Sequence, residues 1–265
     1  MPPDLARLKP ELDRLAALYE DVRFIEDDPV SVPHAFDDPA DREVIGLFAA
    51  ILAWGRRATI LNKMAELAER MRLRPARFVL DFDPARDGPR LDGFKHRTFT
   101  AGDARSLVLA LQAALRRYGS IEAIAAAHLP GDATHVGPAL QGLSDTLMAA
   151  VPGTPRRLQK HLARPDAGSA AKRLAMYVRW MVRPGPVDFG QWTAIRSDQL
   201  VLPLDVHTGR QARKLGLLQR KQDDWRAVRE LTDACALLDP DDPCRYDYAL
   251  FGLGAYGPDG FPERG

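Results

Sequence analysis

Lys172 and Asp205 are the residues whose types and setting favour covalent chemistry. Lys172 begins the apolar run "KRLAMYVRWMV", and Asp205 stands between "VLPL" and a segment with helical periodicity. A lysine in the first turn of a buried helix opposes the helix dipole and, if desolvated, holds more of the neutral amine that a nucleophile requires. An aspartate before a helix accepts hydrogen bonds from its first N–H groups and stays ionised there. An exposed lysine at a frayed helix end and a plain N-cap explain the same two residues.

Basic residues are concentrated around Lys172. Residues 154–183 hold eight Lys/Arg and one acid, whereas residues 1–45 hold twelve acids and five bases, although the whole chain carries only +1. Such segregation favours a groove for a polyanion, and solvated helix faces explain it equally well. Lys172, Arg179 and Arg183 are spaced to share one helix face, and we expect Arg179 to contact the polyanion, which the resemblance described below implies is DNA.

The elements that must position these residues are helices. Helical periodicity recurs along the chain, several segments begin with a capping residue, and Asp103, Gly119 and Ser120 mark helix ends. The expected helices cover residues 11–22, 41–71, 101–119, 120–128, 138–151, 154–163, 169–183, 205–217, 223–238 and 241–257. We therefore expect an all-α fold, forming one domain over residues 1–265 with two helical lobes and a cleft between them.

Composition narrows the setting of the protein. Cys235 and Cys244 are too few for a disulfide framework and cannot alone ligate an iron–sulfur cluster or a tetrahedral zinc. The first twenty residues are charged throughout, and no apolar run is long enough to span a membrane. We expect a cytoplasmic monomer without a membrane partner, cofactor or metal.

A turn precedes Lys172. The stretch "HLARPDAGSAA" reads as a helix end, a short Pro/Gly turn and a new helix start. Backbone N–H groups in such a turn can hold a phosphate, and Gly168 and Ser169 are the expected contacts. Arg156, Arg157 and Lys160, just upstream, would add long-range attraction.

The pieces "LARPDAGSAAKRL" and "LPLDVHTGRQARKL" resemble the helix–hairpin–helix DNA glycosylases. The resemblance implies that Lys172 is the catalytic lysine, that Asp205 is the catalytic aspartate, and that residues 154–217 form the helix–hairpin–helix region. The long gap between the two is similar to the archaeal 8-oxoguanine glycosylase branch and to a related bacterial family of uncharacterised proteins. The resemblance spans residues 35–257 and is most specific over 160–217. "RPDAGSA" replaces the usual hairpin "LPGVG", and the four-cysteine cluster of some relatives is missing.

The function implied by this resemblance is base-excision repair of damaged double-stranded DNA. Such an enzyme would remove an oxidised purine such as 8-oxoguanine and would also act as a Schiff-base lyase. In "LAWGRRATIL", Arg56 and Arg57 stand where relatives fill the vacated base stack, with Trp54 nearer the base pocket unless it packs in the core. His207 and Arg210 fit contacts with the DNA backbone or with Asp205, and they also fit a surface helix.

Three other functions fit the same sequence. A helix–hairpin–helix protein that binds DNA structures without catalysis would keep the hairpin and not form covalent adducts. A metal-dependent hydrolase would use Asp205 and His207 with His161 or His96. A helical interaction module would use its basic residues to bind an acidic partner.

Overall fold

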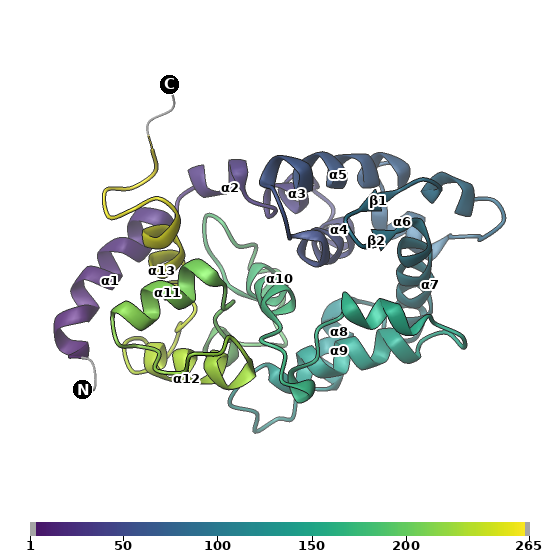
Figure 1. Ribbon diagram of the computed structural model, residues 1–265. Coiled ribbons are helices and arrows are strands. Elements are labelled where there is room, and N and C mark those ends of the chain that lie inside the picture. The colour runs from purple at the N-terminus through teal and green to yellow at the C-terminus, as the bar shows by residue number, and fades with distance from the viewer. Residues whose placement is uncertain (1–3, 263–265) are drawn as a thin grey trace. The chain divides into compact units, whose positions relative to one another are not determined.

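The structure is a computed structural model that describes residues 4–262, and helices dominate it (Figure 1). These residues form thirteen α-helices, four short 3₁₀ helices and one hairpin of two-residue strands. The predicted all-α class is confirmed. Within the described range, none of the helices has both the length and the apolar character to cross a membrane.

The chain folds into two compact units, each assembled from separate segments. Among the described residues, unit 1 comprises 4–26, 131–137 and 164–262, and unit 2 comprises 27–130 and 138–163. The short helix α2 (Arg23–Asp27) ends where the chain passes from unit 1 to unit 2. Lys172 and Asp205 both belong to unit 1.

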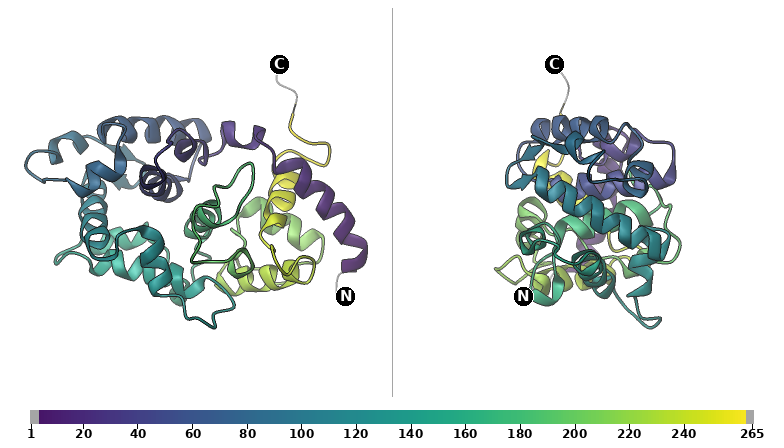
Figure 2. Two further views of the ribbon diagram at one scale, coloured as in Figure 1. Left: turned by 180° about the vertical axis from the view of Figure 1, so that it is seen from behind. Right: turned by 90° about the vertical axis from the view of Figure 1, so that its right-hand side faces the viewer.

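Unit 1 is built around the contacts of its last helix. It contains α1 (Leu5–Tyr19), η3 (Pro165–Ala167), α10 (Lys172–Val182), η4 (Ser197–Gln199), α11 (Val206–Lys214), α12 (Trp225–Ala236) and α13 (Arg245–Ala255). Helix α13 packs against both α1 and α11, as Figures 1 and 2 show. A Cβ at Gly252 would lie 2.2 Å from the Tyr19 ring, and one at Gly254 would lie 2.9 Å from Cβ of His207. Glycine at both positions lets α13 approach its neighbours this closely.

Helix α10 is an interior helix. Every residue from Leu174 to Val182 is buried, and Tyr177 and Trp180 are among the largest fully buried side chains. The apolar character of "LAMYVRWMV" over nearly the whole helix surface predicts this burial, and the prediction is confirmed. Lys172, the first residue of the helix, therefore stands at the end of a rigid, enclosed element.

Unit 2 is organised around α4 (Pro39–Leu52), which is buried from Glu43 to Leu52. Helix α4 packs against α3 (Ser31–His34), α5 (Arg57–Arg70) and α6 (Pro75–Leu80), while α7 (Ala101–Tyr118) packs against α6 and α8 (Ile121–Ala127). The unit also contains η1 (Gly88–Leu91), η2 (Arg156–Lys160) and α9 (Gly137–Ala149) after its first residue. The buried Glu43 carboxylate accepts the N–H groups of Ile121 and Glu122, at 3.0 and 2.8 Å, and so satisfies the start of α8.

The helix ends expected around residues 100–120 are confirmed. Thr100 and Asp103 form a capping box at the start of α7, and Gly119 ends that helix with φ +91°. Ser120 then begins α8 by accepting the N–H of Ala123 at 3.0 Å. These signals are local in sequence, which is why they can be read directly.

Two expected helices differ in the structure. Residues 41–71 are not one helix, because the chain breaks between α4 and α5 at a turn where Gly55 has φ +115°. Residues 154–163 form only the 3₁₀ helix η2, so the α-helix expected before the turn at Gly168 is wrong. A small hairpin, β1 (Lys95–His96) with β2 (Phe99–Thr100), also appears where no strand was expected.

Candidate functional site

The starts of two helices bring Lys172 and Asp205 together in unit 1. Lys172 is the first residue of α10, and Asp205 is the N-cap of α11. The Lys172 Nζ lies 3.3 Å from the Asp205 Oδ2. The structure therefore places the two sequence-predicted residues in direct contact.

The two oxygens of Asp205 have different partners. Oδ1 accepts the backbone N–H of Thr208 at 2.9 Å, which is the N-cap hydrogen bond of α11. Oδ2 is thereby left to face the amine of Lys172. The cap fixes the carboxylate, so the orientation of Oδ2 toward the amine does not depend on a mobile side chain.

Both members of the pair are partly enclosed. The side chain of Lys172 is 34% exposed and that of Asp205 is 13% exposed. The Lys172 side chain is therefore partly open to solvent, while the shielded carboxylate interacts with its neighbours in a medium less polarisable than water. The residue before Lys172, Ala171, has φ +48° and provides no side-chain cap, so α10 starts from a strained backbone position.

Thr208 links Asp205 to a second carboxylate. Its backbone N–H binds Asp205, and its fully buried hydroxyl donates to Asp247 Oδ1 at 3.1 Å. Asp247 lies on α13, so Thr208 connects the start of α11 to α13. The two carboxylates are thus connected through one threonine.

Burial raises the pKa of Asp247 to about 6, and the negative charge of Asp205 adds to the increase. The positive charges of Arg179 and Lys172 and the hydrogen bond from Thr208 act in the opposite direction. Asp247 therefore titrates closer to neutral pH than an ordinary aspartate does. Asp247 is therefore close enough to the Lys172–Asp205 pair to interact with both residues by Coulomb forces.

Arg179 is not available to DNA, and the expectation of a DNA contact there is wrong. Only 3% exposed, it forms ion pairs with Asp247 and, at 3.4 Å, with Asp188. Its Nη2 also donates to the Tyr248 hydroxyl at 3.2 Å. The face that Arg179 shares with Lys172 points into the protein, where acidic residues from other segments neutralise the guanidinium.

Arg183, one turn further along, is buried in the same way. It forms ion pairs with Glu20, the residue that follows α1, with Asp242 at 2.8 Å and with Asp188 at 3.3 Å. Arg179 and Arg183 together share Asp188, which is itself buried. This network joins α10 to the segments around it and holds the helix that carries Lys172.

The turn before α10 lies at the surface. Gly168 is exposed with φ +82°, and no atom lies within 4 Å of the place where a Cβ would be. Its carbonyl accepts the N–H of Trp225 at 3.1 Å, which anchors the turn to the start of α12. The exposed Ser169 accepts the N–H of Ala171 with its hydroxyl at 3.2 Å.

The two predicted contacts on α11 differ in environment. The Nδ1–H of His207 donates to the carbonyl of Gly254 at 3.0 Å, and its ring packs edge-on against Phe251. His207 therefore connects α11 to α13. Arg210 is exposed on α11.

Trp54, Arg56 and Arg57 belong to unit 2, at the break between α4 and α5. The guanidinium of Arg97 lies 4.7 Å from the centre of the Trp54 ring, and His96 Nε2 hydrogen-bonds the Trp54 carbonyl at 3.1 Å. Trp54 is thus half-buried in a cluster with the β1–β2 hairpin. Its proposed place in a base pocket and the proposed stack-filling role of the two arginines remain predictions.

A metal-dependent hydrolase would need a group of side chains that bind a metal ion. Within residues 4–262, no group of three His, Cys, Asp or Glu side chains is placed to do so. His96 and His161 lie in unit 2 and are buried.

Cys235 and Cys244 are buried free thiols, and burial raises the pKa of each.

Sequence reasoning missed Thr208 and Asp247. Asp247 offers a signal, because a carboxylate inside the apolar run "YDYALFGLG" needs a buried partner. Thr208 offers none, because a threonine in the first turn of a helix is common on exposed surfaces. The link between them appears only when α11 and α13 are side by side.

The fold and the site together describe an all-α protein in which a lysine and an aspartate are in contact at the starts of two helices. A family described as "Protein of unknown function (DUF2400)" matches residues 28–256, and the chain belongs to this family. No curated protein matches the chain, and no solved structure matches it.

Proposed function

We propose that this protein is a DNA base-excision glycosylase with Schiff-base lyase activity, in which Lys172 is the nucleophile and Asp205 its carboxylate partner. The observation that carries the proposal is the 3.3 Å contact between Lys172 Nζ and Asp205 Oδ2. An amine that is one-third exposed can reach a ligand, and a carboxylate fixed as a helix cap can act on that amine without rearranging.

The first step is displacement of the damaged base. The neutral amine of Lys172 attacks C1′ of the sugar, the glycosidic bond breaks, and the base leaves with the bonding electrons and takes up a proton. Positive charge develops on the sugar as the bond breaks. The proton that Asp205 took from Lys172 passes to the departing base, and the carboxylate that is left stabilises the sugar. Opening of the sugar ring then gives a protonated imine between Lys172 and C1′.

The second step is strand cleavage. Loss of a proton from C2′ of the imine expels the 3′ phosphate, and water later hydrolyses the imine to free the lysine. The amine must give up a proton before it attacks. Asp205 Oδ2 is the carboxylate oxygen in contact with the amine, so it is the acceptor we propose for that proton.

The proposed substrate is damaged double-stranded DNA, with an oxidised purine such as 8-oxoguanine as the base. We further propose that the two units are the two lobes of a helix–hairpin–helix glycosylase, acting as a monomer in the cytoplasm. Gly168 and Ser169 are proposed to lie against a DNA phosphate, and their exposure directly before α10 supports this. The Ser169 hydroxyl is the proposed donor, because the N–H groups of Gly168 and Ser169 already donate to the carbonyls of Pro165 and Arg164 at 2.8 and 3.2 Å. Arg210, exposed on α11, is proposed to contact the DNA backbone, and His207 is proposed to hold α11 in position.

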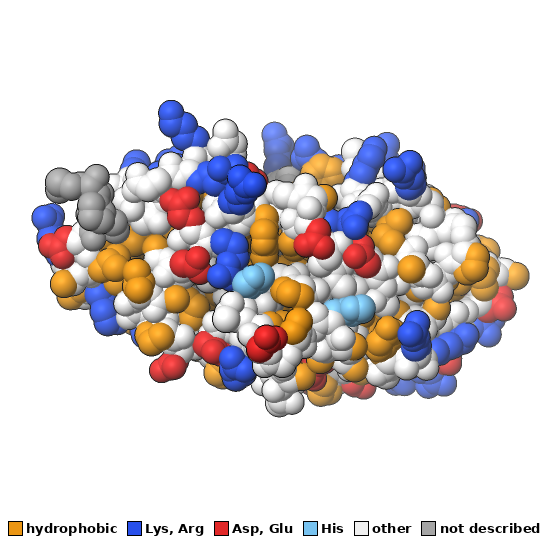
Figure 3. Space-filling model, turned by 90° about the horizontal axis from the view of Figure 1, so that it is seen from below, with side chains coloured by type: hydrophobic (Ala, Val, Ile, Leu, Met, Phe, Trp, Pro, Cys, Tyr) orange, Lys and Arg blue, Asp and Glu red, His pale blue; other side chains and the backbone are white. Residues whose placement is uncertain are grey.

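Arg56 is exposed at the α4–α5 break, and Arg57 follows it. These two arginines are proposed to enter the stack that the extruded base leaves. Trp54 is proposed to lie at the base pocket. On the face shown in Figure 3, Lys and Arg side chains lie among Asp and Glu side chains rather than in one unbroken patch.

Borohydride trapping tests the proposal. The protein is mixed with duplexes carrying 8-oxoguanine, other damaged bases or an abasic site, and borohydride reduces any imine to a stable amine. We expect a covalent complex with wild type and none with Lys172→Gln. Lys214→Gln, which removes an exposed lysine at the end of α11, is the control and should trap normally. Normal DNA binding without any trapped complex would identify a non-catalytic DNA-binding protein instead.

A further inference from the structure

Five arginines line one open cavity of unit 2. The cavity has a volume of about 780 Å³, and its arginines come from the turn after α5, from α6, from the loop that follows it and from α7: Arg72, Arg74, Arg77, Arg86 and Arg116. All five are exposed. This arginine cavity shares no residue with the Lys172–Asp205 site, which lies in unit 1.

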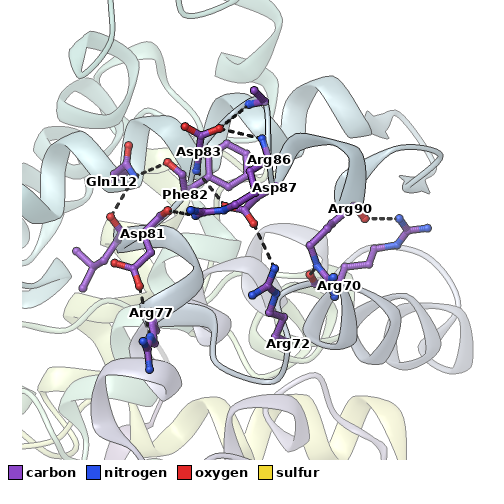
Figure 4. A network of polar contacts seen from close by, with 12 residues as sticks. Arg70, Arg72, Arg77, Asp81, Phe82, Asp83, Arg86, Asp87, Arg90 and Gln112 are labelled. Atoms are coloured by element: carbon purple, nitrogen blue, oxygen red, sulfur yellow. Dashed lines mark hydrogen bonds and ion pairs between the residues drawn. The ribbon is translucent and has the colours of Figure 1, made fainter.

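A buried aspartate fixes part of the cavity. Asp87, only 3% exposed, pairs with Arg86 at 2.6 Å and with Arg72 at 3.5 Å (Figure 4). Its Oδ2 also accepts the backbone N–H of Asp83 at 3.1 Å, and Arg86 donates a second bond to the Asp81 carbonyl at 2.7 Å. Two guanidinium groups are therefore held from the protein side while 60% of Arg72 and 62% of Arg86 remain exposed.

The backbone also places arginines at the cavity. Arg72 and Leu73 have φ +61° and +51°, so two consecutive non-glycine residues adopt the left-handed conformation. Each such residue costs on the order of 1 kcal/mol, and the cost is borne where surrounding structure fixes the chain. The resulting turn leaves both Arg72 and Arg74 on the cavity wall.

The charges of the arginine cavity do not balance. Its walls carry five arginines against two carboxylates, Asp81 and Asp87, an excess of three positive charges. Arg77 pairs with Asp81 at 3.3 Å, but both side chains are largely exposed, so the pair constrains Arg77 little. Like charges gathered in one cavity repel one another, and a bound anion with several charges would relieve that repulsion.

We propose that the arginine cavity binds a phosphate group. Guanidinium groups match the oxygens of phosphate in pairs, and three excess positive charges suit an anion with more than one charge. The volume lies within the range of small-molecule sites. The phosphate belongs either to a small molecule or to a nucleic-acid backbone. The proposal is independent of the glycosylase activity, because it uses none of the residues of unit 1.

Calorimetric titration of the full-length protein with inorganic pyrophosphate at low ionic strength tests this site. We expect one saturable site in wild type, and about tenfold or more weaker binding in both Arg72→Gln and Arg77→Gln, since hydrogen bonds to charged groups are lost. The control is Arg196→Gln. Arg196 is 62% exposed and pairs with Asp198 at 2.8 Å, as Arg77 pairs with Asp81, but it lies outside the cavity.

Unchanged affinity in the Arg196 variant, with the loss in both cavity variants, supports the proposal. Absence of saturable pyrophosphate binding, or equal weakening in all three variants, overturns it. A short DNA duplex titrated into the pyrophosphate complex then identifies the source of the phosphate. Displacement of pyrophosphate indicates a nucleic-acid backbone, and retention indicates a small molecule.

Discussion

Lys172 and Asp205 are in contact although each stands at the start of a different helix. The positive ends of the dipoles of α10 and α11 therefore both act at this contact. Both dipoles attract negative charge to this contact.

The two roles of Asp205 can be separated by substitution. Asparagine caps a helix as well as aspartate does, so Asp205→Asn should keep the bond to Thr208, whereas Asp205→Ala should lower the free energy of unfolding by about 1 kcal/mol. Both variants lose the proton acceptor and the charge. We expect base release to fall by about 100-fold or more in each. Denaturant unfolding and single-turnover kinetics measure the two effects.

Asp224 provides the matched control, because it caps α12 by accepting the N–H of Ala227 at 3.1 Å but does not touch Lys172. Asp224→Asn should leave base release unchanged. If Asp205→Asn kept wild-type activity, the carboxylate would have only its capping role.

The hydroxyl of Thr208 should matter to stability through Asp247. Thr208→Val keeps the shape of the side chain and the backbone bond to Asp205, but it leaves Asp247 Oδ1 without this donor in the interior. We expect the free energy of unfolding to fall by about 1–3 kcal/mol. Thr208→Ser restores the hydroxyl and should recover part of the loss. Equal stability of the valine and serine variants would show that the hydrogen bond contributes nothing.

The raised pKa of Asp247 predicts a distinctive pH dependence. The folded protein holds the proton of this carboxyl up to about pH 6, whereas the unfolded chain releases it near pH 4. Between these values the folded state binds more protons, so the contribution of Asp247 to stability decreases as the pH rises. We therefore compare the free energies of unfolding of wild type and Asp247→Asn. The difference, wild type minus variant, should fall between about pH 4 and pH 6 and stay constant above pH 6.

Asp224 should show the opposite sign. The hydrogen bond from Arg220 lowers its pKa to about 2, so its contribution to stability is lost as the pH falls below 4. Thermal unfolding of wild type and the two asparagine variants across pH 2–7 measures both slopes. A flat difference for Asp247→Asn would mean that this carboxyl titrates normally.

Substitution of Arg179 should affect stability, whereas substitution of Arg210 should affect DNA binding. Arg179→Met removes the partner of Asp188 and Asp247 in the interior, and we expect a loss of about 3–5 kcal/mol in the free energy of unfolding. Arg210→Gln, at an exposed position, should leave stability unchanged and weaken binding to duplex DNA with a smaller salt dependence. A stable Arg179→Met variant with impaired DNA binding would restore Arg179 as a DNA contact.

Local signals explain what the sequence predicts well. Asp103, Ser120 and Asp205 are caps whose partners lie three residues away, so the helix starts follow from short segments. The apolar surface of α10 likewise predicts its burial. The contact between Lys172 and Asp205 was expected from the resemblance to a glycosylase family, since nothing in the spacing alone brings the two segments together.

Distant partners explain what the sequence does not predict. The spacing of Lys172, Arg179 and Arg183 correctly indicates one helix face, but it cannot reveal that Asp188 and Asp247 lie opposite that face. The positive charge of residues 154–183 therefore overstates what the surface carries, because Arg179 and Arg183 are neutralised inside the protein. Thr208 was missed for the same reason.

Mass mapping of the trapped complex tests the central claim most directly. A duplex carrying a damaged base or an abasic site is reacted with wild-type protein under borohydride, digested, and analysed for the peptide that carries the reduced sugar adduct. The account predicts the adduct on Lys172 and its loss in Lys172→Gln. An adduct on another lysine or on the terminal amine, retained in Lys172→Gln, would contradict it.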